Sequence, residues 1–179
     1  MLNQALFSHK TVEHQTPKWL FDTLTSVYHF DLDAAASVEN AQCSKFFTKE
    51  DDAFTKKWHE HGDYIWLNPP YGKDIGSWLG KAFIESLQGA VVICLLPART
   101  DTKWFQHAAP RAEYVLFLKG RLKFENTAST APFPSVIFAF GKTSHTAAEW
   151  ETIKKLGSLF IASPALYSTP KTLKWCNDG

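Results

Sequence analysis

The chain has 179 residues and a formal net charge of +1, with 45% hydrophobic and 21% charged residues. This composition is ordinary for a globular domain, and the near-neutral total neither supports nor excludes nucleic acid, because a local basic patch can be hidden in it. The 3 cysteines form no Cys-x-x-Cys pair and no apolar run has transmembrane length, so we expect no disulfide scaffold, no metal and no membrane span. We therefore expect a cytoplasmic protein.

Residues 1–15 are polar and aperiodic, and we interpret them as a flexible N-terminal arm that orders on a partner. One folded domain is expected over residues 16–179. It begins with a helix, for which Thr16 suits the N-cap and Pro17 the first helical position. Its apolar face is formed by Trp19, Leu20, Leu24 and Val27.

A short strand followed by a tight loop of small residues is predicted within residues 30–37, and another short strand at Phe46 and Phe47 in the otherwise irregular segment 38–63. The apolar run 64–67, the helical periodicity of 75–88 and the apolar run 91–96 then predict a strand, a helix and a buried strand. This order is typical of a βαβ unit, in which the two strands run parallel.

The remaining elements are a helix near 101–108, strands at 113–118 and 133–140, a helix near 146–156 and a strand at 158–162. The long polar connection between the strands at 113–118 and 133–140 resembles a hairpin. The whole pattern predicts an α/β fold with a mostly parallel central sheet.

The sequence Asn68-Pro69-Pro70-Tyr71 follows the strand at 64–67 and precedes the helix at 75–88. In an open α/β sheet this is the carboxyl end of a strand, where ligands bind. An ordinary proline-rich turn beside a helix N-cap is the alternative interpretation. The residue types also suit one reaction, methylation of an exocyclic aromatic amine, whose nitrogen lone pair is delocalised into the ring.

Hydrogen-bond acceptors that bind both amino hydrogens make such a nitrogen more nucleophilic. The side-chain oxygen of Asn68 and the carbonyl of Pro69, in a loop stiffened by Pro70, are suitable acceptors. Tyr71 can stack on a base that has been flipped from the duplex.

Several segments in the same order resemble the phage-type (Dam-like) DNA N6-adenine methyltransferase family. They are TPKWLFDTL, FDLDAAAS, ENAQC, KEDDAF, WLNPPYG, LLPARTDTKWF, GRLKF and PFPSVIFAF. The resemblance implies a Rossmann-like, S-adenosylmethionine-dependent methyltransferase domain with a late antiparallel strand, acting on N6 of adenine in double-stranded DNA. It also implies roles for cofactor-binding residues: Thr16, Pro17, Asp33, Ala34, Asn40, Asp52 and Ala53.

Within that set, Asp33 resembles the carboxylate that pairs with the cofactor's ammonium, and Asp52 the acceptor for its adenine amine. The glycine-rich loop usual after the first strand is alanine here, which departs from the pattern. Asn40 or Glu39 is the candidate for the ribose hydroxyls.

Basic residues follow two later strands, and we expect them to contact DNA: Arg99, Lys103, Arg121 and Lys123. If the two strands before these residues run parallel to the strand at 64–67, the basic residues lie at the same edge of the sheet as Asn68. The alternative interpretation is that they belong to ordinary solvated loops.

Other substrates of the same loop type remain open, namely cytosine N4, RNA adenine and a protein amide, as does an inactive DNA-binding relative. The oligomeric state also remains open. A P-loop ending at Gly141-Lys142-Thr143 is rejected because its first glycine would fall on Val136.

Overall fold

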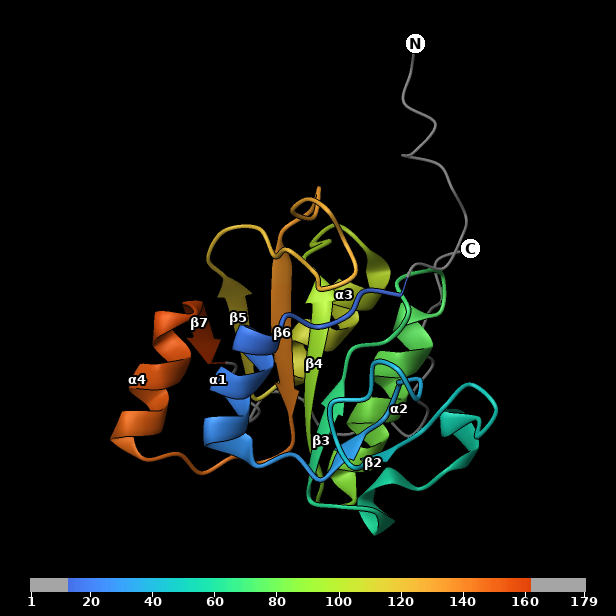
Figure 1. Cartoon of the computed structure of the whole chain (residues 1–179). Coiled ribbons are helices and arrows are strands. Elements are labelled where there is room, and N and C mark those ends of the chain that lie inside the picture. Colours follow the sequence, from blue (N-terminus) through green and yellow to red (C-terminus); the bar gives the residue numbers. More distant parts are fainter. Residues whose placement is uncertain (1–12, 162–179) are drawn as a thin grey trace.

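The computed structural model describes residues 13–161, in which seven strands form one sheet in the order β2-β1-β3-β4-β6-β5-β7 (Figure 1). The strands β2, β1, β3 and β4 are parallel neighbours, whereas β6 is antiparallel to β4 and β5, and β7 is antiparallel to β5. The expected late antiparallel strand is therefore present as two strands, β6 and β7. The bounds are β1 (Leu32–Asp33), β2 (Lys45–Phe46), β3 (Tyr64–Leu67), β4 (Val91–Pro97), β5 (Tyr114–Leu118), β6 (Ser135–Phe140) and β7 (Gly157–Ile161).

Helices cover both faces of the sheet. On one face, Tyr114 of β5 contacts the Trp150 ring of α4 (Ala147–Lys155), and α4 packs against α1 (Lys18–Tyr28). On the other face, Phe138 of β6 contacts Phe105 of α3 (Lys103–Ala108), and Phe140 contacts Phe83 of α2 (Ile75–Leu87). Short 3₁₀ turns at Ala53–Thr55, Trp58–Glu60 and Ala109–Arg111 complete the secondary structure. The predicted α/β class is thus confirmed.

The start of α1 differs from the expectation. Pro17, with φ −60° and ψ 129°, is the N-cap, and the helix begins at Lys18 without a side-chain cap. Thr16 therefore lies one position too early to cap the helix, and its hydroxyl instead accepts a hydrogen bond from the Asn68 side chain. The expected N-cap role for Thr16 and the first-turn position of Pro17 are corrected accordingly.

No helix connects β1 to β2; residues 34–44 form turns and bends. The Asp33 carboxylate organises this loop by accepting hydrogen bonds from the N–H groups of Ala35 and Gln42. The loop consequently stays near the carboxyl end of β1.

The carboxyl ends of β3, β4 and β5 lie at one edge of the sheet. The strand β4 is the parallel neighbour of β3, and β5 runs in the same direction, although β6 lies between β4 and β5. The loops after these strands, residues 68–74, 98–102 and 119–134, therefore leave the sheet at the same edge. None of the helices between residues 13 and 161 is long and apolar enough to cross a membrane.

Candidate functional site

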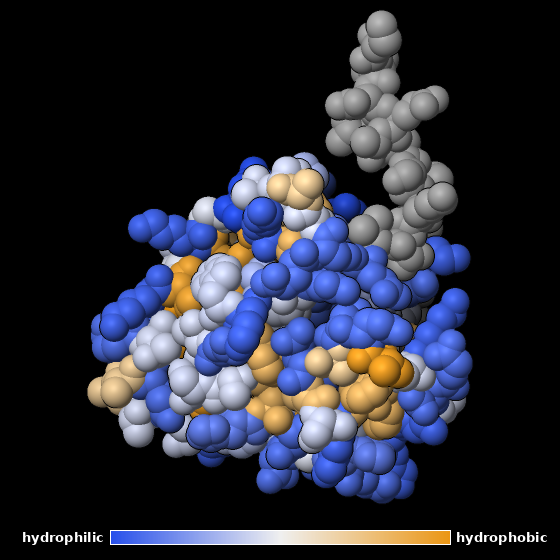
Figure 2. Space-filling view, viewed as in Figure 1, coloured by the Kyte–Doolittle hydropathy of each residue, from blue (hydrophilic) through white to orange (hydrophobic). Residues whose placement is uncertain are grey.

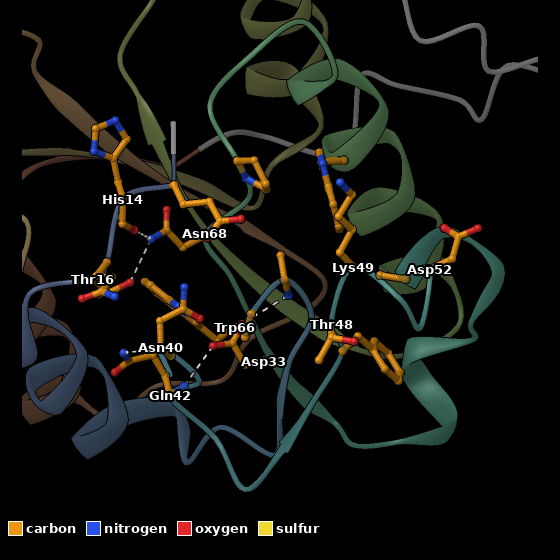
Figure 3. Close-up of a pocket in the computed structure, with 18 of the residues that line it drawn as sticks. His14, Thr16, Asp33, Asn40, Gln42, Thr48, Lys49, Asp52, Trp66 and Asn68 are labelled. Carbon is orange, nitrogen blue, oxygen red and sulfur yellow. Dashed lines mark hydrogen bonds between the residues drawn. The ribbon is translucent and has the colours of Figure 1, made fainter. Parts of the chain in front are cut away.

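A cavity lies at the carboxyl ends of β1, β2 and β3 (Figure 3). Its walls come from residues 13–16, which we call the strap, from the β1–β2 loop and residues 47–54, and from Asn68, Pro70 and Trp78. Figure 3 shows Asn68 beside the strap on one side of the cavity and Lys49 and Asp52 on the other. The cavity thus occupies the position where open α/β sheets bind ligands.

Most of the site residues predicted from the sequence are brought together here. Those that line the cavity are Thr16, Asp33, Asn40, Asp52, Ala53, Asn68 and Pro70. Ala34 is fully buried and donates its N–H to the Trp66 carbonyl, while the next two alanines, Ala35 and Ala36, line the cavity. Pro17, Pro69 and Tyr71 are buried nearby without lining it.

Sequence reasoning missed several cavity residues. Trp78 fits the core-facing stripe of its helix, but its ring lies 4.5 Å from that of Phe54 on the cavity wall. An aromatic residue in the first turn after the Asn-Pro-Pro-Tyr loop could have indicated this. Gln42 and Lys49 lie in the segments ENAQC and KEDDAF but were given no role, and His14 carries no pattern that predicts its position.

Two acceptors of the strap hold the side-chain amide of Asn68. Its Nδ2 donates to the His14 carbonyl oxygen at 2.5 Å and to the Thr16 hydroxyl at 3.0 Å (Figure 3). A carbonyl oxygen can only accept, so the nitrogen of the amide must face the strap. The oxygen Oδ1 therefore faces away from the strap and remains available as an acceptor.

Three buried polar atoms of cavity-lining residues lack a hydrogen-bond partner among residues 13–161: His14 Nδ1, Trp66 Nε1 and Asn68 Oδ1. Buried polar groups in folded proteins nearly always have partners, because an unsatisfied one costs about 1–3 kcal/mol. Unpartnered polar atoms on residues of one cavity suit a polar ligand there, although the His14 ring itself packs among Tyr71, Phe124 and Phe133, which do not line the cavity.

Asp33 supplies a negative charge to the cavity. It is only 2% exposed, and burial raises the pKa of its carboxyl to about 6, although the N–H donors of Gln42 and Ala35 act in the opposite direction. A buried carboxylate of this kind is stabilised by a cationic ligand.

Tyr71 lies within an aromatic cluster at the strap side of the cavity. Its ring is 8% exposed and contacts Phe124 and Phe133 edge-on, while the His14 ring lies 4.8 Å away with a tilt of 45°. Its hydroxyl donates to the Leu95 carbonyl at 3.3 Å. Burial also lowers the pKa of the His14 imidazole, which favours the neutral ring.

The four basic residues expected to contact DNA are all exposed. Arg99 and Lys103 follow β4, and Arg121 and Lys123 follow β5, so both pairs lie near the edge that carries Asn68. Between Arg121 and Lys123, the buried Leu122 anchors the loop to the core. In Figure 2, the face of the molecule that is seen in Figure 1 carries hydrophilic side chains interspersed with white and orange ones.

Within residues 13–161, no group of three His, Cys, Asp or Glu side chains is arranged to hold a metal ion. The sequence His59-Glu60-His61 has residue types that can bind metals, but His59 bonds through Nδ1 to the buried Glu85 at 2.5 Å.

Fold and site together define an α/β domain with a polar ligand cavity at the carboxyl ends of its parallel strands. The family model described as "DNA N-6-adenine-methyltransferase (Dam)" matches residues 7–144 of the chain. The chain therefore belongs to the Dam family of DNA N-6-adenine-methyltransferases.

Two relatives carry the same description. A DNA N-6-adenine-methyltransferase of Escherichia phage T1 is 36% identical over 109 residues, which are 60% of this chain and 44% of the relative. A DNA N-6-adenine-methyltransferase of Haemophilus phage HP1 is 31% identical over 114 residues, 62% of this chain and 65% of the relative. The chain thus matches less than two thirds of the length of either relative.

Substitutions at Tyr71 separate the roles of its ring and its hydroxyl. Tyr71→Phe removes only the bond to the Leu95 carbonyl and is expected to cost about 1 kcal/mol of unfolding free energy. Tyr71→Ala leaves a cavity among three aromatic rings and is expected to cost about 3–5 kcal/mol. Urea unfolding of both variants measures the difference, and equal losses would contradict this account of the ring.

Proposed function

We propose that this chain transfers a methyl group from S-adenosylmethionine to N6 of adenine in double-stranded DNA. One observation carries the proposal: Asn68 presents a buried, unpartnered acceptor oxygen at the cavity, and the strap fixes its orientation. The names of the two phage relatives and of the family support adenine N6 as the target.

In this mechanism Asn68 acts on the amine of a flipped adenine. Its Oδ1 accepts one amino hydrogen and the Pro69 carbonyl accepts the other, which localises the lone pair on nitrogen. Correct placement of the amine supplies much of the rate enhancement, so the reaction needs no strong general base. Tyr71 provides the stacking surface for the flipped base.

The residues of the cavity fit the proposed cofactor. Asp33 offers a buried negative charge for an ammonium, and the Trp66 indole N–H is an unpartnered donor for an anionic or carbonyl oxygen. On the side away from Asn68, Asp52 lines the cavity next to the rings of Phe54 and Trp78, and we propose it as the acceptor for an adenine amine, with Asn40 as the candidate for the ribose. When bound, S-adenosylmethionine supplies a methyl group on a positively charged sulfur; N6 gains the N–C bond, the C–S electron pair stays on sulfur, and N6 loses a proton to solvent.

Cytosine N4, RNA adenine and protein amides have amines of similar shape, and an inactive relative would bind without turnover. Incubation of the protein with labelled cofactor and unmethylated genomic DNA, followed by nucleoside digestion, separates these cases. N6-methyladenine is the expected product.

Asn68→Ala is expected to reduce methyl transfer by at least about 10²–10³-fold, because a transition-state acceptor is lost. Cofactor affinity should stay within about twofold, since the role of Asn68 is toward the target amine. Single-turnover rates at saturating cofactor, together with calorimetry of cofactor binding, test both points. A variant that retained half the wild-type rate would refute the catalytic assignment.

Cofactor binding is expected to depend on pH through Asp33. Its pKa is about 6 in the free protein, so below pH 6 the carboxyl is neutral and loses its attraction for a cation. Affinity should therefore fall by about tenfold from pH 7 to pH 5 and change little above pH 7, with proton release on binding near pH 6. Asp33→Asn is the control: its affinity should be lower and nearly independent of pH, which separates Asp33 from the nearby His14.

We further propose that the edge bearing Arg99, Lys103, Arg121 and Lys123 binds DNA phosphates. Replacing Arg99 and Arg121 by alanine should weaken DNA binding and lower the slope of log affinity against log salt by about 0.9 per lost contact. Cofactor binding should be unchanged. DNA affinity measured from low to high salt decides the point, because an unchanged slope would place the DNA elsewhere.

A further inference from the structure

The strap that orients Asn68 is itself held by the loop between β5 and β6. We infer that Asn126 of this loop is a positioning residue for methyl transfer, which acts through the strap on the Asn68 amide. The inference rests on the proposed catalytic role of Asn68.

Four hydrogen bonds join the loop to the strap and its junction with α1. Asn126 accepts from the Gln15 N–H at 3.1 Å through Oδ1 and donates to the Glu13 carbonyl at 2.9 Å through Nδ2. Glu125 donates its backbone N–H to the Gln15 carbonyl at 3.0 Å and accepts from the Lys18 N–H at 2.9 Å through Oε1. Asn126 therefore binds the backbone on both sides of His14 with one side chain.

The position of the His14 carbonyl decides which end of the Asn68 amide faces the substrate. With this carbonyl in place, Nδ2 must face the strap and Oδ1 is presented as an acceptor. If the strap shifts, the amide can rotate and present its NH₂ group instead. Two donors would then face each other, because the target amine also carries hydrogens.

The other contacts of the strap do not fix this carbonyl. The His14 ring packs against Phe124 at 4.5 Å and Phe133 at 5.6 Å, which holds the side chain. The Thr16 side chain is buried and fixes the far end of the strap. Between these anchors, the peptide groups of residues 13–15 bond to Asn126 and Glu125, so the orientation of the carbonyl depends on the loop.

This loop also carries Arg121 and Lys123, which we propose as phosphate contacts. The segment expected to touch DNA and the segment that fixes the catalytic amide are therefore joined within a few residues. Asn126 itself carries no charge, so its substitution separates positioning of the amide from attraction of the phosphates.

The experiment compares Asn126→Ala, Asn126→Asp and a control, Thr130→Ala, an exposed position of the same loop. Asn126→Ala is expected to lower the single-turnover rate about tenfold at saturating cofactor and DNA, because the amide is no longer held in one orientation. Asn126→Asp keeps the acceptor for Gln15 but loses the donor for Glu13, so an intermediate rate is expected. DNA affinity and its salt slope should match those of the wild type in Asn126→Ala and Thr130→Ala, and Thr130→Ala should keep the wild-type rate. Asn126→Asp adds a negative charge near the proposed phosphate contacts, so it is compared with the wild type only by its rate at saturating DNA.

A double-mutant cycle with Asn68→Asp shows whether Asn126 acts through Asn68. The aspartate carboxylate has two acceptor oxygens and no NH₂ group, so its orientation no longer decides whether an acceptor faces the substrate. Asn126→Ala should therefore cost less than about twofold in the Asn68→Asp background. An equal fold loss in both backgrounds would mean that Asn126 serves only the fold, and the inference would be overturned.

An independent measurement does not require activity. The NMR signals of the Asn68 side-chain NH₂ group, assigned by their loss in Asn68→Asp, should exchange slowly with solvent in the wild type and faster in Asn126→Ala. Unchanged exchange would overturn the inference. A different outcome is also informative: exchange is slow in the wild type and faster in Asn126→Ala, but the protein does not methylate DNA. This result would overturn the proposed function and leave the link from the loop to the amide intact.

Discussion

The bond from the Asn68 amide to the His14 carbonyl connects the sheet to the segment before the first helix. It gives a flexible side chain one orientation, and it leaves an acceptor oxygen buried without a partner. Such an atom destabilises the folded protein unless a ligand donates to it, and the interior magnifies this effect because its dielectric constant is low. The unpartnered oxygen is the reason that we propose a hydrogen-bond donor from the substrate at this position.

The sheet topology brings distant parts of the sequence to this bond. The parallel strands β1, β3 and β4 place the Asp33 and Asn68 loops at one edge, and β5, which runs in the same direction as β4, returns the chain to this edge. The loop of residues 119–134 then reaches the strap, although Asn126 and Gln15 are separated by 111 positions in the sequence. The direction of β5 in the sheet therefore makes this long-range contact available.

Local sequence patterns predicted much of the fold, because the strands at 64–67 and 91–96 and the helix at 75–88 have clear periodicity and well-marked ends. The position of the Asn68 loop could be predicted for the same reason, since it directly follows the strand at 64–67, whereas Asp33, the last residue of β1, became a candidate only through the resemblance to the family. The prediction that Thr16 caps the first helix was wrong. Threonine favours the N-cap position, but the Thr16 hydroxyl instead makes a long-range hydrogen bond to Asn68, which no local pattern reveals. His14 and Asn126 could not be found from the sequence, because they act through backbone contacts that only the tertiary fold creates.

The position of His14 constrains how a base can enter. Its imidazole covers the Tyr71 ring, whose other ring contacts, Phe124 and Phe133, approach edge-on. A base that stacks on Tyr71 must therefore displace the imidazole. Rotation of the His14 side chain about χ1 away from Phe124 and Phe133 would not require the His14 carbonyl to move, because the strap backbone is bonded separately to Asn126. In the proposed mechanism the ring and the carbonyl of His14 therefore have separate tasks, since only the carbonyl bonds to Asn68.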